Sequence, residues 1–270
     1  MALTDKLTAI GDAIREKEGS TELIALGDMP ERILNLSTGG AGEDAVRASV
    51  LALLNGEVVE FVVPAGTTKI YNYSFENNQK IKRIVYENEA QVKSFGEGAF
   101  QSCSNMLMER FPTGFNATTI PYACFKGCNN ITLEEGIPEG VTTLESYAFS
   151  GAFDLQFTTL PSTLTTIYPY AFSYAFSEYN TAPDPLPPVM LTIPAGVKTI
   201  DSNAFQGVGL KKIRFLGTPT NMNVRAFQQA TAITDIYVPW METINVGSVA
   251  PWGATNATIH YETPADEVIT

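Results

Sequence analysis

Apolar residues recur along this chain in a repeat centred on a phenylalanine, which we call the hub. An apolar residue stands five positions before each hub, a small residue stands directly before it, and a short side chain follows three positions after it. Ile120, Cys124, Phe125 and Cys128 form one such unit. The seven hubs are spaced 25, 25, 24, 23, 33 and 22 residues apart: Phe75, Phe100, Phe125, Phe149, Phe172, Phe205 and Phe227. A repeat of this period is typical of a solenoid.

The repeat predicts ladders of equivalent side chains, because each coil of a solenoid returns to the same place in cross-section. The hub ring should fill the interior, and the residue before it must be small because interiors are packed to crystal-like density. Extended apolar segments lie between the hubs and end near proline or glycine, as in Val58–Pro64, Leu191–Pro194 and Ile236–Pro239. We predict strands there.

Units such as Leu191–Ile200 followed by Ala204–Gly207 resemble the leucine-rich repeats of bacterial surface antigens called BspA-like. The resemblance covers roughly residues 57–240. It implies an α/β repeat fold, a right-handed leucine-rich-repeat solenoid of seven coils. Each coil would carry one short parallel strand, with irregular or short helical structure on the return side. It also implies a binding surface and no catalytic apparatus.

Residues 1–38 predict a small helical module for docking or oligomerisation. Its first helix would carry an apolar stripe, and a second would begin near Met29–Glu31 with Pro30 in its first turn. The stripe consists of Leu3, Leu7, Ile10 and Ile14. Helices this short are marginal alone, so we expect them to pack on a partner chain, on a second copy or on the solenoid end.

Both ends of the solenoid need a cover over the apolar interior and the strand edge. Residues 39–56 predict a linker rich in glycine followed by an amphipathic capping helix, with Val46, Val50, Leu53 and Leu54 on one face. Residues 241–270 predict a C-terminal cap and tail. The segment Trp252–Tyr261 should close the far end.

The two termini carry a second resemblance. Residues 3–33 look like an N-terminal segment shared by tail-associated proteins of phages and prophages of Gram-positive gut bacteria, and Ala250–Tyr261 is similar to a closing segment of the same proteins. This resemblance implies a structural or host-recognition component of a phage-derived particle. Related arrays also occur as cell-surface proteins.

The net charge of −12 argues against nucleic acid or an anionic membrane surface as a partner, because such contacts depend on Lys and Arg. From Gly127 to Val197 the chain has no Lys or Arg. No apolar run approaches the ~20 residues that a membrane-spanning helix needs. No signal peptide is visible after Met1. We expect a virion-associated or extracellular, cell-surface location.

The long spacing between Phe172 and Phe205 marks an insertion covering residues 173–188. Insertions in repeat proteins map to loops on one face, and that face often binds. The loop combines aromatic residues with prolines, and its candidate ligand-binding residues are Tyr174, Phe176, Tyr179 and Asp184. The alternative is a tolerated surface loop whose aromatic side chains pack back on the coil.

Candidate catalytic and metal-binding residues are few. Cys103, Cys124, Cys128 and the single histidine, His260, could be assembled as zinc ligands, but all three cysteines stand at small positions of the repeat. Free cysteine is a common buried small residue, and an odd count argues against a disulfide framework. Glycine motifs and adjacent carboxylates such as Glu134 and Glu135 set up no site. We expect no enzyme activity, no metal and no cofactor.

Two functions remain as hypotheses. The first is a phage- or prophage-derived tail-associated or host-recognition component, which would contact phage structural proteins or itself through residues 1–38. The second is a bacterial cell-surface or secreted adhesin that binds a protein or glycan.

Overall fold

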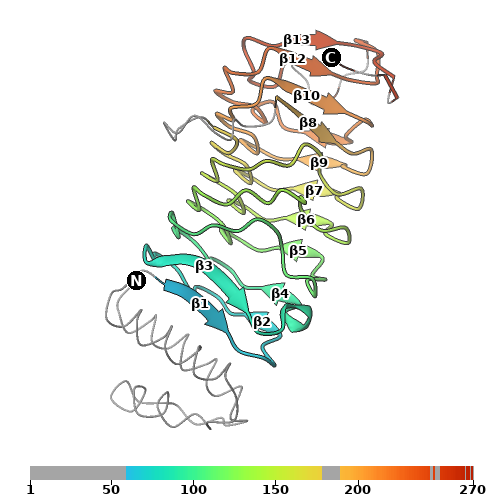
Figure 1. The fold of residues 1–270 in the computed structure, drawn as a ribbon. Helices are drawn as coiled ribbons and strands as arrows, with labels where there is room; N and C mark the ends of the chain where they lie inside the picture. The colour runs from blue at the N-terminus through green and yellow to red at the C-terminus, as the bar shows by residue number, and fades with distance from the viewer. Residues whose placement is uncertain are drawn as a thin grey trace, which may run out of the picture.

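The computed structural model describes residues 59–177, 189–243, 246, 250–264, 266, 267 and 269. These residues form a parallel β-solenoid whose coils follow one another along a single axis from β1 to β13 (Figure 1). The predicted solenoid is therefore confirmed. The predicted module of residues 1–38 and the linker and capping helix of residues 39–56 lie outside the described residues.

Two ladders of strands run along the solenoid, where the sequence predicted one strand per coil. In the second ladder every strand has two residues, and the inward one stands five positions before the hub. A two-residue strand leaves no alternation to read, so sequence periodicity could not reveal it. The strands of the second ladder are β2 (Lys69–Ile70), β4 (Ser94–Phe95), β5 (Thr119–Ile120), β6 (Thr143–Leu144), β7 (Thr166–Ile167), β9 (Thr199–Ile200) and β11 (Asn221–Met222).

The first ladder contains the predicted apolar strands. It is regular near both ends and reduced between them to the isolated parallel bridges Arg83–Leu107, Met108–Ile131 and Thr159–Thr192. A 3-10 helix, η1 (Glu89–Gln91), follows its second strand. The strands of the first ladder are β1 (Val59–Val63), β3 (Ile81–Tyr86), β8 (Met190–Ile193), β10 (Lys212–Phe215), β12 (Asp235–Tyr237) and β13 (Thr258–His260).

The seven hub phenylalanines form a continuous stack through the core. Neighbouring ring centroids are 5.2–5.5 Å apart, and their planes lie within 15° of each other. Each hub N–H from Phe75 to Phe205 donates to the carbonyl of the residue directly before the next hub, at 2.7–3.0 Å. Successive turns are thus in direct backbone contact, and this contact is why the residue before the hub is small.

The C-terminal segment closes the solenoid by adding a further turn. β13 pairs with β12, and the N–H of Phe227 donates to the carbonyl of Trp252 at 2.8 Å. Trp252 is buried, with its ring centroid 6.4 Å from Phe215 and 6.3 Å from Trp240. A buried indole therefore ends the aromatic core, and the predicted cover is itself part of the repeat.

Candidate functional surface

At every hub except Phe227, the residues two positions before and two positions after it lie in the left-handed backbone region, and at Phe227 only the later one does. Glycine, which adopts this region readily, takes four of these thirteen positions, among them Gly127 and Gly151 (φ 70° and 71°), and residues with side chains take the other nine. Tyrosine takes the same conformation at Tyr147, Tyr170 and Tyr174, with φ of 62°, 61° and 56°. The left-handed region costs a side-chain-bearing residue ~1–2 kcal/mol. Ser102, Ala123 and Asn203 adopt it as well, so the conformation belongs to the repeat turn and is not specific to tyrosine.

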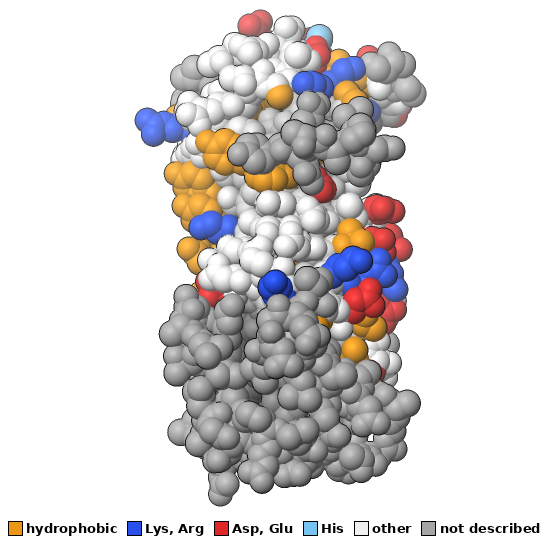
Figure 2. All heavy atoms as spheres, turned by 60° about the vertical axis from the view of Figure 1, so that its left-hand side comes forward, with side chains coloured by type: hydrophobic (Ala, Val, Ile, Leu, Met, Phe, Trp, Pro, Cys, Tyr) orange, Lys and Arg blue, Asp and Glu red, His pale blue; other side chains and the backbone are white. Residues whose placement is uncertain are grey.

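Five tyrosines lie on three successive hub turns, and we call this set the tyrosine ridge: Tyr122, Tyr147, Tyr168, Tyr170 and Tyr174. Within it, Tyr147 and Tyr170 stack face to face, 4.8 Å apart at 1°. Tyr122 meets Tyr147 edge to face at 6.0 Å. The side chains of Tyr122, Tyr168 and Tyr174 are 41%, 39% and 48% exposed. Figure 2 shows hydrophobic side chains, a class that includes tyrosine, in several patches on the face that it draws.

Tyr174 is held in a fixed orientation on this ridge. Its ring lies over Gly207 of the next turn, where an added Cβ would come within 2.5 Å of the Tyr174 Cε1 atom. Its hydroxyl donates to Gln229 Oε1 at 3.1 Å and accepts from Gln206 Nε2 at 3.5 Å. A ring fixed before binding loses little conformational entropy on contact with a partner.

The tyrosine ridge carries little charge. Lys126 lies over the ring of Tyr147, with its Nζ 4.9 Å from the centroid, and it is the last cation before Lys198. Burial raises the pKa of Tyr147, with smaller contributions from Tyr170 and Tyr122. The Tyr147 phenol therefore stays protonated at neutral pH and can donate a hydrogen bond. The ridge can contact a partner through the apolar area of its aromatic rings and through its hydroxyl groups.

The structure separates the residues predicted for the inserted loop. Tyr174 lies on the ridge, but Phe176 is fully buried and packs 5.2 Å from Phe157 and 5.8 Å from Phe172. We therefore correct its role from ligand contact to core residue, which is the alternative considered for this loop. Tyr179 and Asp184 lie outside the described residues, as do Leu3, Leu7, Ile10 and Ile14.

The three cysteines occupy the repeat positions expected of them and are fully buried. The thiols of Cys103 and Cys128 donate to the hub carbonyls of the preceding coils, Phe75 O at 2.8 Å and Phe100 O at 2.9 Å. Burial raises the pKa of the Cys124 and Cys128 thiols. Such thiols are poor nucleophiles.

His260 lies on β13, several coils away along the axis from the cysteines. Its Nε2 is 2.7 Å from Asp235 Oδ1, and its ring stacks on Tyr237 at 4.5 Å. The part of the chain that the structure describes contains no group of three or more His, Cys, Asp or Glu residues placed to hold a metal ion. Within that same part, no helix is both long and apolar enough to cross a membrane.

Four of the five ridge residues were not predicted from the sequence. The signal was present, because a tyrosine stands two or three positions before each of three consecutive hubs, at Tyr122, Tyr147 and Tyr170. Without the turn conformation, nothing indicated that these positions face outward and stack.

Comparison with known proteins agrees with the repeat. The model of the BspA type leucine rich repeat region matches in 6 copies, over residues 52–178 and 189–250. The chain belongs to this family. No curated protein matches this BspA-type chain.

A crystal structure of a leucine rich cell surface protein from Faecalibacterium prausnitzii A2-165 is similar at 19% identity and a TM-score of 0.34. The match covers 78% of this chain and 83% of that one. At that level of similarity it adds nothing to the family assignment.

Proposed function

We propose that this BspA-type repeat protein is a non-enzymatic recognition protein that binds a protein on a cell surface through the tyrosine ridge. The observation that carries the proposal is the row of tyrosines on three successive turns, two of them stacked face to face. Tyrosine is enriched where proteins bind one another, because it offers large, amphipathic area with few rotatable bonds.

Protein is favoured over glycan as the partner of the ridge. A sugar stacks on an open ring face, but Tyr147 and Tyr170 cover each other's faces and Lys126 lies over the ring of Tyr147. The stacked pair therefore offers a partner mainly its ring edges and hydroxyls. These suit the mixed polar and apolar surface of a folded protein.

The test uses a triple variant of the three most exposed ridge residues, Tyr122→Ser, Tyr168→Ser and Tyr174→Ser. We expect the labelled parent protein to bind cultured epithelial cells, and binding to be lost after the cells are treated with protease. The triple variant should bind at least ~10-fold more weakly, because aromatic anchors dominate interface energetics.

A matched control changes two exposed apolar residues away from these turns, Val189→Ser and Met241→Ser, which are 59% and 55% exposed. The control should bind like the parent. Equal binding by the triple variant and the parent, or no binding by the parent, would show the proposal to be wrong. Binding that survives protease and is lost after glycosidase treatment would replace the protein partner with a glycan.

A second candidate function is a phage- or prophage-derived tail-associated component, supported by the resemblance of residues 3–33 and of Ala250–Tyr261 to such proteins. Ala250–Tyr261 forms the last turn of the solenoid, a role compatible with either function. Antibody labelling of particles induced from a lysogenic host would test it. Label on the cell envelope with none on particles would exclude it.

A further inference from the structure

The first strand ladder separates between the second and third coils, and the separation opens a cleft. β3 pairs with β1 along its length but meets the next coil only where Arg83 lies opposite Leu107. There the Leu107 N–H donates to Lys82 O at 2.9 Å. Beyond that point Met108 pairs with Ile131 of the following coil instead.

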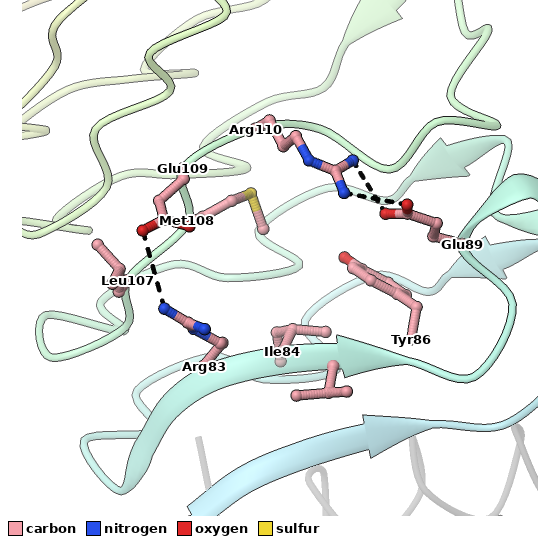
Figure 3. A pocket seen from close by; sticks show the side chains of 9 residues that line it. Arg83, Ile84, Tyr86, Glu89, Leu107, Met108, Glu109 and Arg110 are labelled. Atoms are coloured by element: carbon pink, nitrogen blue, oxygen red, sulfur yellow. Dashed lines mark hydrogen bonds and ion pairs between the residues drawn. The ribbon is translucent and has the colours of Figure 1, made fainter.

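The cleft is enclosed by these two diverging segments. One wall is the edge of β3 from residue 83 to residue 86, and the other is formed by residues 107–110 (Figure 3). Its volume is about 250 Å³. The apolar side chains of Ile84, Leu107 and Met108 contribute to the lining, so the cleft has an apolar surface as well as charges.

Two ion pairs of opposite polarity cross the cleft. Arg110 donates to both carboxylate oxygens of Glu89, each at 3.0 Å, and Arg83 Nη2 lies 3.8 Å from Glu109 Oε1. The four charges sum to zero, so the cleft selects no net charge in a ligand. Their side chains are 34–57% exposed. Exposed ion pairs contribute little to stability, so they can exchange partners at low cost.

Tyr86 adds an unpaired hydroxyl to this arrangement. Its ring lines the cleft, and its hydroxyl end points toward the Arg110–Glu89 pair (Figure 3). The hydroxyl has no hydrogen-bond partner and is closed off from solvent. Burial raises its pKa, so it remains a phenol that can both donate and accept. Unpaired buried polar groups are few in folded proteins, and this hydroxyl has its hydrogen-bonding capacity available for a ligand.

We propose that this cleft binds one neutral sugar ring. Sugar hydroxyls donate and accept, and the cleft alternates guanidinium donors with carboxylate acceptors. The C–H faces of the ring would lie against Ile84 and Met108. A hydroxyl that displaces Glu89 from Arg110 would supply the partner that Tyr86 lacks. The site shares no residue with the tyrosine ridge, so the two proposals stand or fall separately.

Saturation-transfer NMR on the full chain tests the proposal with glucose, galactose and N-acetylglucosamine as probes. We expect at least one of the three to bind with a Kd of about 1–10 mM, as weak single-ring ligands do. Tyr86→Phe removes only the hydroxyl and should weaken binding roughly three- to tenfold, which is the effect of one hydrogen bond. Arg110→Gln should weaken it similarly.

Control variants separate binding from folding. Removing an unpaired buried hydroxyl is neutral or stabilising, so loss of binding in Tyr86→Phe cannot result from unfolding. Tyr237→Phe and Arg225→Gln make the same chemical changes on β12 and on an exposed hub turn and should bind like the parent. The ridge triple variant should also keep sugar binding.

Two outcomes would overturn the proposal. The first is no saturation transfer to any of the three sugars, and the second is unchanged affinity in Tyr86→Phe and Arg110→Gln. If the first outcome were accompanied by binding of a free amino acid such as glycine, the paired charges would select a zwitterion.

Discussion

Phe125 is the central hub, and its replacement by alanine tests the ladder most directly. The ring is fully buried and stacks between Phe100 at 5.4 Å and Phe149 at 5.3 Å. It also meets Phe95 and Phe111 edge to face, each at 5.8 Å. The change therefore removes four ring contacts, two with the rings stacked on the faces of Phe125 and two with the rings that it meets edge to face.

The expected cost follows from these contacts. Truncation of a buried phenylalanine costs ~3–5 kcal/mol when the cavity cannot collapse. Collapse is opposed here because the backbones of neighbouring turns are held by the hydrogen bonds from Phe100 to Cys124 and from Phe125 to Ala148. The upper half of the range is therefore expected. A cost of that size lowers the melting temperature by roughly 8–20 °C in a chain of this length.

Thermal and urea unfolding, followed by circular dichroism, would measure this cost. Phe75→Ala is the matched control, because Phe75 has one stacked hub neighbour in place of two and is 8% exposed. Phe75→Ala should lower the free energy of unfolding by clearly less than Phe125→Ala does. A melting temperature of Phe125→Ala within a degree or two of the parent would refute the hub assignment, and equal losses at both hubs would refute the argument from stacking.

Three further predictions concern the core, the last turn and the N-terminal segment. Cys103, Cys124 and Cys128 should all react with a thiol reagent in denaturant and hardly at all in the folded protein at pH 8; rapid reaction without denaturant would contradict their burial. The hydrogen bond from the neighbouring histidine lowers the pKa of Asp235 below its ordinary 3.8, so the stability lost in Asp235→Asn should be full at pH 6 and vanish as the pH falls through the lowered value. Urea unfolding of parent and variant at pH 6 and at several lower pH values checks the sign, and a difference that grows as the pH falls would be inconsistent with it. Removing residues 1–38 should leave the melting temperature nearly unchanged while altering the assembly state measured by light scattering; an unfolded product would assign those residues to the cap of the solenoid.

The fold could be predicted from the sequence because the repeat constrains it at every coil. Each hub, the apolar residue five positions before it and the small residue directly before it recur seven times, and one structural reason explains all three. The strands predicted in Val58–Pro64, Leu191–Pro194 and Ile236–Pro239 were found, with small shifts of their bounds, as β1, β8 and β12. An extended apolar segment ending near proline or glycine marked each of them.

The surface could be predicted only in part, because the repeat leaves outward positions free. Phe176 looked like an exposed loop aromatic, yet it follows its hub by four positions and turns into the core beside Phe157. Tyr147 and Tyr170 were overlooked because the left-handed conformation of the turn is not encoded by residue type there. The cleft beside β3 depends on where two coils diverge, a long-range property that no local pattern reports.

The hub turn also determines how this chain tolerates changes in length. The coil between Phe172 and Phe205 is 33 residues long, yet these two rings are 5.3 Å apart, the same separation as between Phe125 and Phe149 in a coil of 24. Register is therefore set at the turn, and extra residues elsewhere in a coil leave the neighbouring coils in place. A foreign peptide inserted at residues 178–188 should consequently be displayed at one fixed position along the axis. This chain could therefore serve as a scaffold that presents an epitope at a defined position.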